Sequence, residues 1–331
     1  MHIVVTGGAG FLGTRLCRAL LADGALSAAG APELRIDRLT VLDRTAPIAD
    51  VDADPRVAAS TTDLLDTCRA GPHPADDADV VFHLAAAVSG ECERDFDLGM
   101  RTNLDGTLAL LRRCRASGRI PVVVFASSLA VFGSTVGYPL PPAVTDQTLP
   151  VPQTSYGTQK FVCEQLLADY TRRGFLRGRS VRLPTVSVRP GRPNTAASSY
   201  LSGIIREPLN GQRADCPVDP DVPAAICSPD GAIRGLLRAA TAGPEEWGAP
   251  IAVNLPAITV TAAQMVSALA QVAGDDVAAL VDWRPDQMIA SIVQGWPSRL
   301  RTDRAARLGL QPDENLEAIV RAHIRETQSP H

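Results

Sequence analysis

Close to the amino terminus lies Ile3-Val4-Val5-Thr6-Gly7-Gly8-Ala9-Gly10-Phe11-Leu12-Gly13, a β-branched run followed by a glycine-rich turn. Apolar residues then recur at helical spacing, at Phe11, Leu12, Leu16, Leu20 and Leu21. A strand, a glycine turn and a helix together form a phosphate-binding loop, because the N–H groups and the dipole at the helix start favour a pyrophosphate. Any tight turn could use three glycines, but their position directly after the first strand favours a dinucleotide-binding unit.

The second predicted strand covers 39–42 and ends at Asp43. An acid at this position can accept hydrogen bonds from the adenosine ribose and repel a 2′-phosphate, which favours NAD over NADP. Asp43 lies further from the glycines than is usual, and a turn-rich surface connection at 24–35 accounts for the extra length. Two alternatives stay open: Asp43 could merely cap a turn, and the neighbouring Arg44 could tolerate a 2′-phosphate.

Strands and helices continue to alternate along the chain. We expect further strands over 57–60, 79–84, 121–126 and 181–188, the last interrupted by Pro184 near its carboxyl end, and helices over 91–117 and 154–173. Such alternation predicts the α/β class, with a Rossmann-type doubly wound parallel sheet.

The pattern changes after Arg189. Residues 134–153 are expected to form an irregular flap and 208–229 a loop-rich segment, followed by helices at 230–242, 261–273, 304–310 and 316–325 and strands at 251–255 and 279–283. We assign 1–188 to an NAD-binding domain, with return elements at about 224–256. Residues 189–331 are assigned mainly to a smaller C-terminal α/β substrate lobe.

Several residues that follow strands are candidates to contact the cofactor. Asp63, with Leu64, could lie near the adenine, or Asp63 could instead cap the helix through Cys68. After strand 79–84, Ala85 and Ala86 are small enough for the backbone to approach the cofactor closely. We interpret the preceding His83 as a packing residue rather than a catalyst.

Asn103 falls in the middle of the predicted helix 91–117, where asparagine is a poor helix former. It therefore indicates either a break in the helix or a hydrogen-bonding role beside the cofactor.

Tyr156 and Lys160 lie four residues apart on a predicted helix, so their side chains share one face. A nearby ammonium favours the phenolate and is expected to lower the pKa of the tyrosine, which could then accept a proton. Lys160 is the chain's only lysine, which argues against an accidental pairing. Ser128, at the carboxyl end of strand 121–126, is placed to donate to a substrate oxygen.

Together, Gly7, Gly10, Gly13, Asp43, Asp63, Leu84-Ala85-Ala86, Asn103, Ser128 and Tyr156/Lys160 resemble the extended short-chain dehydrogenase/reductase family, which includes the nucleotide-sugar epimerases. The resemblance implies that Tyr156 is the acid/base, that Lys160 holds the nicotinamide ribose and tunes Tyr156, and that Ser128 aligns the substrate. It also implies a homodimer through helices near 91–117 and 154–173. The implied cofactor contacts are Gly7, Gly10, Phe11, Leu12, Gly13, Asp43, Asp63, Leu64, Leu84, Ala85, Ala86, Asn103, Tyr156, Lys160 and Thr185.

Within the family, sugar-nucleotide dehydratases carry an acidic pair where this chain has Leu129 and Ala130. The stretch from Arg182 to Leu209 instead resembles the branch that oxidises the C2 hydroxyl of D-erythronate, a four-carbon sugar acid. Arg192 with Asn194 could bind the carboxylate, although Arg192 could equally pair with a surface acid. The expected substrate contacts are Ser89, Ser128, Tyr156, Arg192 and Asn194.

Two rival functions stay open: a nucleotide-diphosphate-sugar 4-epimerase that retains its NADH, and a non-catalytic NAD-sensing protein. The intact Tyr156 and Lys160 argue against the second.

Composition excludes several other classes. The net charge of −4 over 331 residues gives no reason to expect nucleic acid or a membrane surface as partner. Seven cysteines without a Cys-x-x-Cys pair and five histidines without ligand spacing predict reduced thiols and no metal site. Because Met1-His2 leads directly into the first strand without a secretory signal, a cytoplasmic enzyme is expected.

Overall fold

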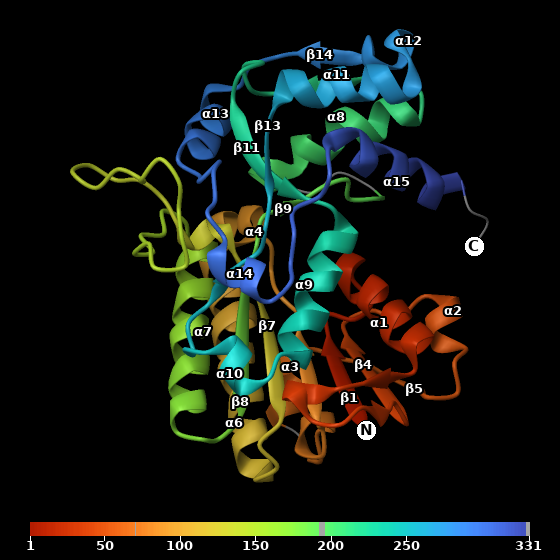
Figure 1. Ribbon diagram of the computed structural model, residues 1–331, viewed down its shortest axis with the longest axis vertical. Coiled ribbons are helices and arrows are strands. Elements are labelled where there is room, and N and C mark those ends of the chain that lie inside the picture. Colours follow the sequence, from red (N-terminus) through yellow and green to blue (C-terminus); the bar gives the residue numbers. More distant parts are fainter. Residues whose placement is uncertain (70, 192–195, 329–331) are drawn as a thin grey trace.

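The computed structural model describes residues 1–69, 71–191 and 196–328. Its centre is a seven-stranded sheet with the order β12-β8-β7-β6-β1-β4-β5, in which every neighbouring pair is parallel (Figure 1). The strands are β1 (His2–Thr6), β4 (Arg38–Asp43), β5 (Val57–Thr61), β6 (Val80–His83), β7 (Val122–Ser128), β8 (Arg177–Leu183) and β12 (Val253–Asn254). The expected doubly wound α/β fold is confirmed, with the strand order reversing between β1 and β6.

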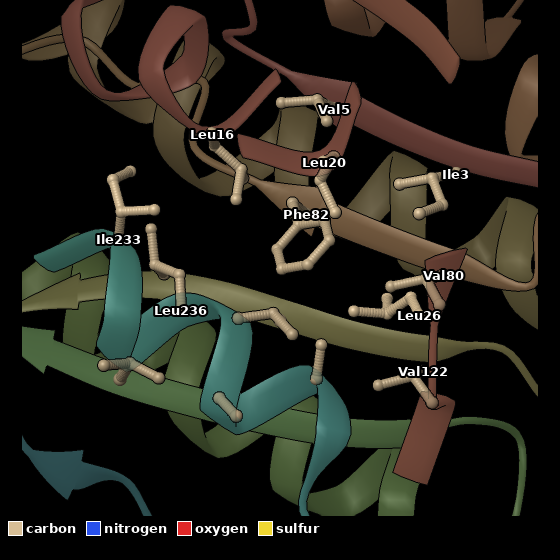
Figure 2. Packing of buried hydrophobic residues seen from close by; sticks show 14 of the residues in the cluster. Ile3, Val5, Leu16, Leu20, Leu26, Val80, Phe82, Val122, Ile233 and Leu236 are labelled. Carbon is tan, nitrogen blue, oxygen red and sulfur yellow. The ribbon is translucent and has the colours of Figure 1, made fainter. Parts of the chain in front are cut away.

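The central strands β1, β6 and β7 are buried on both faces, so apolar residues predominate in them. Ile3 and Val5 of β1 face one side, where they join Leu16 of α1 (Phe11–Asp23) and Leu236 of α9 (Pro229–Thr241) in one core around Phe82 (Figure 2). Val4 faces the other side, in a core with residues of α6 (Gly106–Ser117) and α7 (Ser155–Arg172). This alternation is the two-residue period of a strand.

A second lobe lies above the carboxyl edge of the main sheet (Figure 1). It contains β11 (Pro223–Cys227) between β13 (Ile258–Thr261) and β9 (Thr185–Val186), and a separate pair of β10 (Ala214–Cys216) with β14 (Val281–Trp283). Its helices are α8 (Tyr200–Leu209), α11 (Ala262–Ala273), α12 (Asp275–Ala278), α13 (Gln287–Gln294) and α15 (Leu316–Gln328). Because α9 packs on the main sheet and β12 pairs with β8, we propose the division into 1–188 with these return elements and a mainly substrate-binding 189–331.

The remaining short elements connect these layers. They are β2 (Ala25–Leu26), η1 (Ala28–Gly30), β3 (Leu34–Arg35), α2 (Ala49–Asp52), α3 (Leu64–Arg69), η2 (Pro74–Asp76), η4 (Leu129–Val131), η5 (Ala197–Ser199), α10 (Pro244–Trp247) and α14 (Asp303–Arg307).

Three expectations need correction. The connection at 24–35 pairs β2 with β3 and buries Leu26 in the core, so it is more than a surface turn. The loop-rich segment 208–229 contains β10 and β11. These strands are too short, and too closely flanked by prolines, for an alternation of apolar and polar residues to be recognised in the sequence. The expected strand 181–188 is two strands in different sheets, because Pro184 lacks the N–H needed to continue the ladder.

The expected helix 91–117 is also interrupted. It consists of α4 (Ser89–Arg94), α5 (Phe96–Gly99), a wide π-helical turn η3 (Met100–Asp105) and α6. Asn103 lies in that wide turn, where the backbone stays helical from α5 into α6. The helix is therefore widened rather than broken at Asn103, and the break lies at Asp95, whose backbone is extended.

Candidate active site

A cavity of about 520 Å³ opens at the carboxyl edge of the main sheet, beneath the second lobe. This volume is in the usual range for small-molecule sites (~300–1,000 Å³). Most of the residues proposed from the sequence line it: Gly7, Gly10, Phe11, Leu12, Gly13, Asp43, Asp63, Leu64, Leu84, Ala85, Ala86, Ser89, Ser128, Tyr156, Lys160 and Thr185. Arg192 and Asn194 lie outside the described residues.

The glycine loop fits the pyrophosphate of a dinucleotide. A Cβ atom at Gly13 would collide with the carbonyl oxygen of Gly7, so the start of α1 can approach the loop only with glycine there. Gly10 precedes α1 and provides no side-chain cap, which leaves the first N–H groups of the helix to an anion.

Asp43 and Asp63, the two acids expected at the adenosine end, each accept hydrogen bonds from backbone N–H groups. The Asp43 carboxylate accepts hydrogen bonds from the N–H of Ala9, at 3.0 Å, and of Thr45, at 3.3 Å. Asp63 accepts from the N–H of Leu65 at 3.0 Å and so caps the start of α3. Asp43 therefore caps a turn and Asp63 caps a helix, which are the structural roles that the sequence left open, and both residues also line the cavity. Their cofactor contacts stay predictions.

Asn103 has a different place from the one expected. It is 2% exposed and is absent from the described lining of the cavity. Its side-chain oxygen accepts from the N–H of Ala87 at 2.8 Å, and its amide nitrogen donates to Gln159 of α7 at 2.8 Å. Asn103 thus joins the loop after β6 to α7, and we assign it a positioning role rather than a direct cofactor contact.

Tight packing brings Ser128 and Tyr156 together. Thr154 caps α7 by accepting from the N–H of Gly157 at 3.0 Å, which fixes the helix start beside Tyr156. A Cβ at Gly157 would collide with the carbonyl oxygen of Ala130, so α7 lies directly against the turn that follows Ser128. The Ser128 oxygen accepts from the N–H of Ala130 at 3.1 Å, which holds the hydroxyl at the end of β7.

Lys160 is anchored below Tyr156. Its Nζ donates to the carbonyl oxygen of Ala126 at 2.9 Å and lies 4.7 Å from the ring centroid of Phe125 and 5.6 Å from that of Tyr156. The ammonium is thus held by a backbone oxygen and two aromatic faces.

Burial dominates the ionisation of both groups. It raises the pKa of Tyr156 to about 12, against a lowering by the side-chain hydrogen bond with Ser128. Burial also lowers the pKa of Lys160 to about 8. The expected net lowering of the Tyr156 pKa is therefore wrong for the protein by itself, because desolvation by burial is the largest influence on this pKa.

A buried ion pair behind Lys160 was missed by sequence reasoning. Glu164, one turn further along α7, accepts from Arg182 of β8 through both carboxylate oxygens, at 2.9 and 2.7 Å, and also from Ser127. Both charged side chains are at most 5% exposed. An acid four residues after Lys160 and an arginine in the buried part of β8 were the available signals.

His83 lies between two threonines. Its Nδ1 is 2.7 Å from the Thr6 hydroxyl and its Nε2 is 2.8 Å from that of Thr107. Burial lowers its pKa to about 3. The interpretation of His83 as a packing residue is consistent with these contacts.

The part of the cavity beside the second lobe includes side chains that sequence reasoning did not select. Arg189, Ser202 and Arg206, which follow β9 or belong to α8, all line it. Only the fold of the second lobe brings them to the cavity. Across the described ranges, no cluster of three or more His, Cys, Asp or Glu could hold a metal ion, and no helix is long and apolar enough to span a membrane.

Comparison with known proteins identifies close relatives. The family model of the NAD dependent epimerase/dehydratase family matches residues 3–223. A D-erythronate dehydrogenase of Cupriavidus necator is 48% identical, with 98% of each chain covered. A D-erythronate dehydrogenase of Haemophilus influenzae is 39% identical, with 98% of this chain and 99% of the relative covered.

A solved structure is similar over nearly the full chain as well. It is described as a nucleoside-diphosphate-sugar epimerase from Agrobacterium tumefaciens, with a TM-score of 0.87 and 39% identity. The match covers 98% of this chain and 94% of the solved one.

Proposed function

Because the chain belongs to the NAD dependent epimerase/dehydratase family, we propose that it oxidises the C2 hydroxyl of a small sugar acid with NAD. The substrate that the relatives favour is D-erythronate, and the product would be 2-oxo-tetronate. The observation that carries the proposal is the convergence of Ser128, Tyr156 and Lys160 on the cavity that the glycine loop also lines.

The residues of this chain supply binding and proton transfer. The glycine loop and the start of α1 would hold the pyrophosphate, and Asp43 would accept from the adenosine ribose. NAD, when bound, supplies the hydride acceptor. Tyr156 takes the proton of the C2 hydroxyl, and Ser128 donates to the same oxygen as it becomes a carbonyl.

Lys160 has two roles in this scheme. It would hold the nicotinamide ribose, and its charge beside the Tyr156 ring favours the phenolate once the tyrosine loses its proton. The tyrosine alone holds its proton strongly. Proton transfer therefore depends on Ser128, Lys160 and the bound ligands acting together.

The test measures formation of NADH by its absorbance, with purified protein, NAD and D-erythronate. Steady production of NADH is expected, with NADP giving a much lower rate because the Asp43 carboxylate, which lines the cavity, would repel a 2′-phosphate. A panel of other sugar acids defines the chain length and stereochemistry accepted. No NADH with any acid in the panel would contradict the proposal.

A 4-epimerase of nucleotide-diphosphate sugars is the alternative, favoured by the name of the similar solved structure. It would use the same three residues but interconvert UDP-sugars without net NADH. Incubation with UDP-glucose, followed by sugar analysis, distinguishes the two. Binding of NAD without turnover of either substrate class would indicate the non-catalytic NAD-sensing protein.

We also propose a cytoplasmic homodimer. Phe96 of α5 and Val162 of α7 are exposed by 59% and 37% on the helices expected at the dimer face. Light scattering with size-exclusion chromatography tests this, and a monomer at micromolar concentration would contradict it.

A further inference from the structure

The substrate side of the cavity carries a concentration of positive charge. Among the described residues, four cationic side chains line the cavity: Arg44, Lys160, Arg189 and Arg206. Arg44 follows Asp43 at the adenosine end, and Lys160 is held by the carbonyl of Ala126. Arg189 and Arg206 therefore are the two candidates to meet a substrate anion.

The Arg206 guanidinium already makes hydrogen bonds within the protein. It is 4% exposed, and it donates to the carbonyl oxygen of Arg189 at 2.7 Å and to the Glu207 carboxylate at 2.6 Å. A guanidinium so paired and buried would have to lose these contacts before it could bind a ligand. These contacts suit Arg206 to holding Arg189 in place rather than to binding a ligand.

Arg189 is held by its backbone rather than by its guanidinium. Its N–H donates to the Ser202 hydroxyl at 3.0 Å, and its carbonyl oxygen accepts from Arg206. Both contacts come from α8, so α8 fixes the point from which the Arg189 side chain starts. The side chain is half-buried and lines the cavity.

The charges around Arg189 favour an added anion. Burial lowers the pKa of Arg189, the positive charge of Arg206 lowers it further, and Glu91 of α4 acts in the opposite direction. Glu91 belongs to α4, whose first residue, Ser89, also lines the cavity. A carboxylate here would relieve the repulsion between the two arginines.

We propose that Arg189 binds the carboxylate of the substrate, and that Ser202 and Arg206 are positioning residues that hold Arg189 toward the cavity. This inference rests on the proposed oxidation of a sugar acid. It assigns to Arg189 the role that the sequence suggested for Arg192. Arginine presents two parallel N–H donors to a carboxylate, so it fixes the orientation of C1 and with it the C2 hydroxyl facing Tyr156.

The test compares an acid with its uncharged counterpart. Steady-state kinetics are measured with D-erythronate and D-erythronamide for the unchanged protein, Arg189→Gln and Arg189→Lys. Arg189→Gln is expected to lower kcat/KM for the acid by about 10- to 100-fold, mainly through KM, as for loss of a charged hydrogen bond. The kcat/KM for the amide, which lacks the charge, should change little. The kcat/KM of Arg189→Lys for the acid should lie between those of the unchanged protein and Arg189→Gln, because an ammonium cannot bind both carboxylate oxygens in the same way.

Arg284→Gln is the matched control. It removes the same charge from an exposed arginine that pairs with Asp215 and Asp282, outside the described lining of the cavity. Its kinetics should equal those of the unchanged protein. NAD affinity, measured by calorimetry, should be the same for all variants.

The outcomes separate this inference from the function on which it rests. If the unchanged protein oxidises no sugar acid, the proposed function fails. The inference is overturned if the unchanged protein oxidises D-erythronate and Arg189→Gln has the same ratio of kcat/KM for the acid to kcat/KM for the amide as the unchanged protein. If Arg189→Gln does not fold, the same ratio is measured for Arg189→Lys, and an unchanged ratio overturns the inference. Weaker binding of UDP-glucose with unchanged acid kinetics would assign Arg189 to a diphosphate and also overturn the inference.

Discussion

The two halves of the cavity are built differently. The half expected to hold the cofactor is lined by the glycine loop after β1, by Ala85 and Ala86 after β6 and by Asp43 at the end of β4, and Gly13 leaves no room for a side chain. The half expected to hold the substrate is lined partly by residues that follow β9 or belong to α8, among them the polar side chains of Arg189 and Ser202. Binding in the first half therefore depends on backbone shape, whereas binding in the second depends on which side chains the lobe brings in.

Tyr156 lies where the halves meet, so its loss should separate binding from chemistry most clearly. Tyr156→Phe removes the proton acceptor but keeps the ring beside Lys160. We expect a loss of about 10²- to 10⁴-fold in kcat, with NAD affinity almost unchanged. Rates come from NADH formation and affinity from calorimetry. A variant that keeps its rate would remove Tyr156 as the base.

Glu164→Gln tests the support behind the cofactor half. The substitution leaves Arg182 buried without its carboxylate, and we expect a loss of about 3–5 kcal/mol in the free energy of unfolding. The control on the same helix is Asp169→Asn, which breaks an exposed pair with Arg172 and should cost less than about 1 kcal/mol. Urea denaturation measures both. Equal effects would show that the buried pair is unimportant.

Gly13→Ala tests whether backbone shape governs the cofactor half. The added Cβ would collide with the Gly7 carbonyl oxygen, so we expect destabilisation of about 1–3 kcal/mol and weaker NAD binding. Gly203→Ala in α8 is the counterpart in the second lobe, where the nearest atom to the added Cβ is 3.7 Å away. Its NAD affinity should be unchanged. Equal NAD affinities for the two variants would contradict the comparison.

The smallest expected effect concerns acid stability. Burial lowers the pKa of His83 to about 3 from 6.5, so between these values the unfolded chain binds one proton more than the folded chain. The free energy of unfolding therefore falls as pH falls from 6.5 toward 3. His83→Gln should flatten this fall, as measured by urea denaturation at pH 7 and pH 5. An unchanged slope would show that His83 does not contribute.

The doubly wound α/β class and most of the half expected to hold the cofactor follow from local patterns. Glycine spacing after β1, the acid at the end of β4 and the Tyr156/Lys160 spacing are short-range features of the sequence. Each depends on backbone geometry within one turn or one helix. The sequence therefore placed 16 of the proposed site residues on the cavity, and Asn103 near it.

The sequence by itself determined the α/β fold, the glycine cradle and the catalytic spacing, because these depend on neighbouring residues. Tertiary structure alone brought Arg189 to the cavity, where contacts from α8 hold its backbone. It also decided the ionisation of Tyr156 and Lys160. Desolvation depends on everything packed around a side chain, and no local pattern reports it.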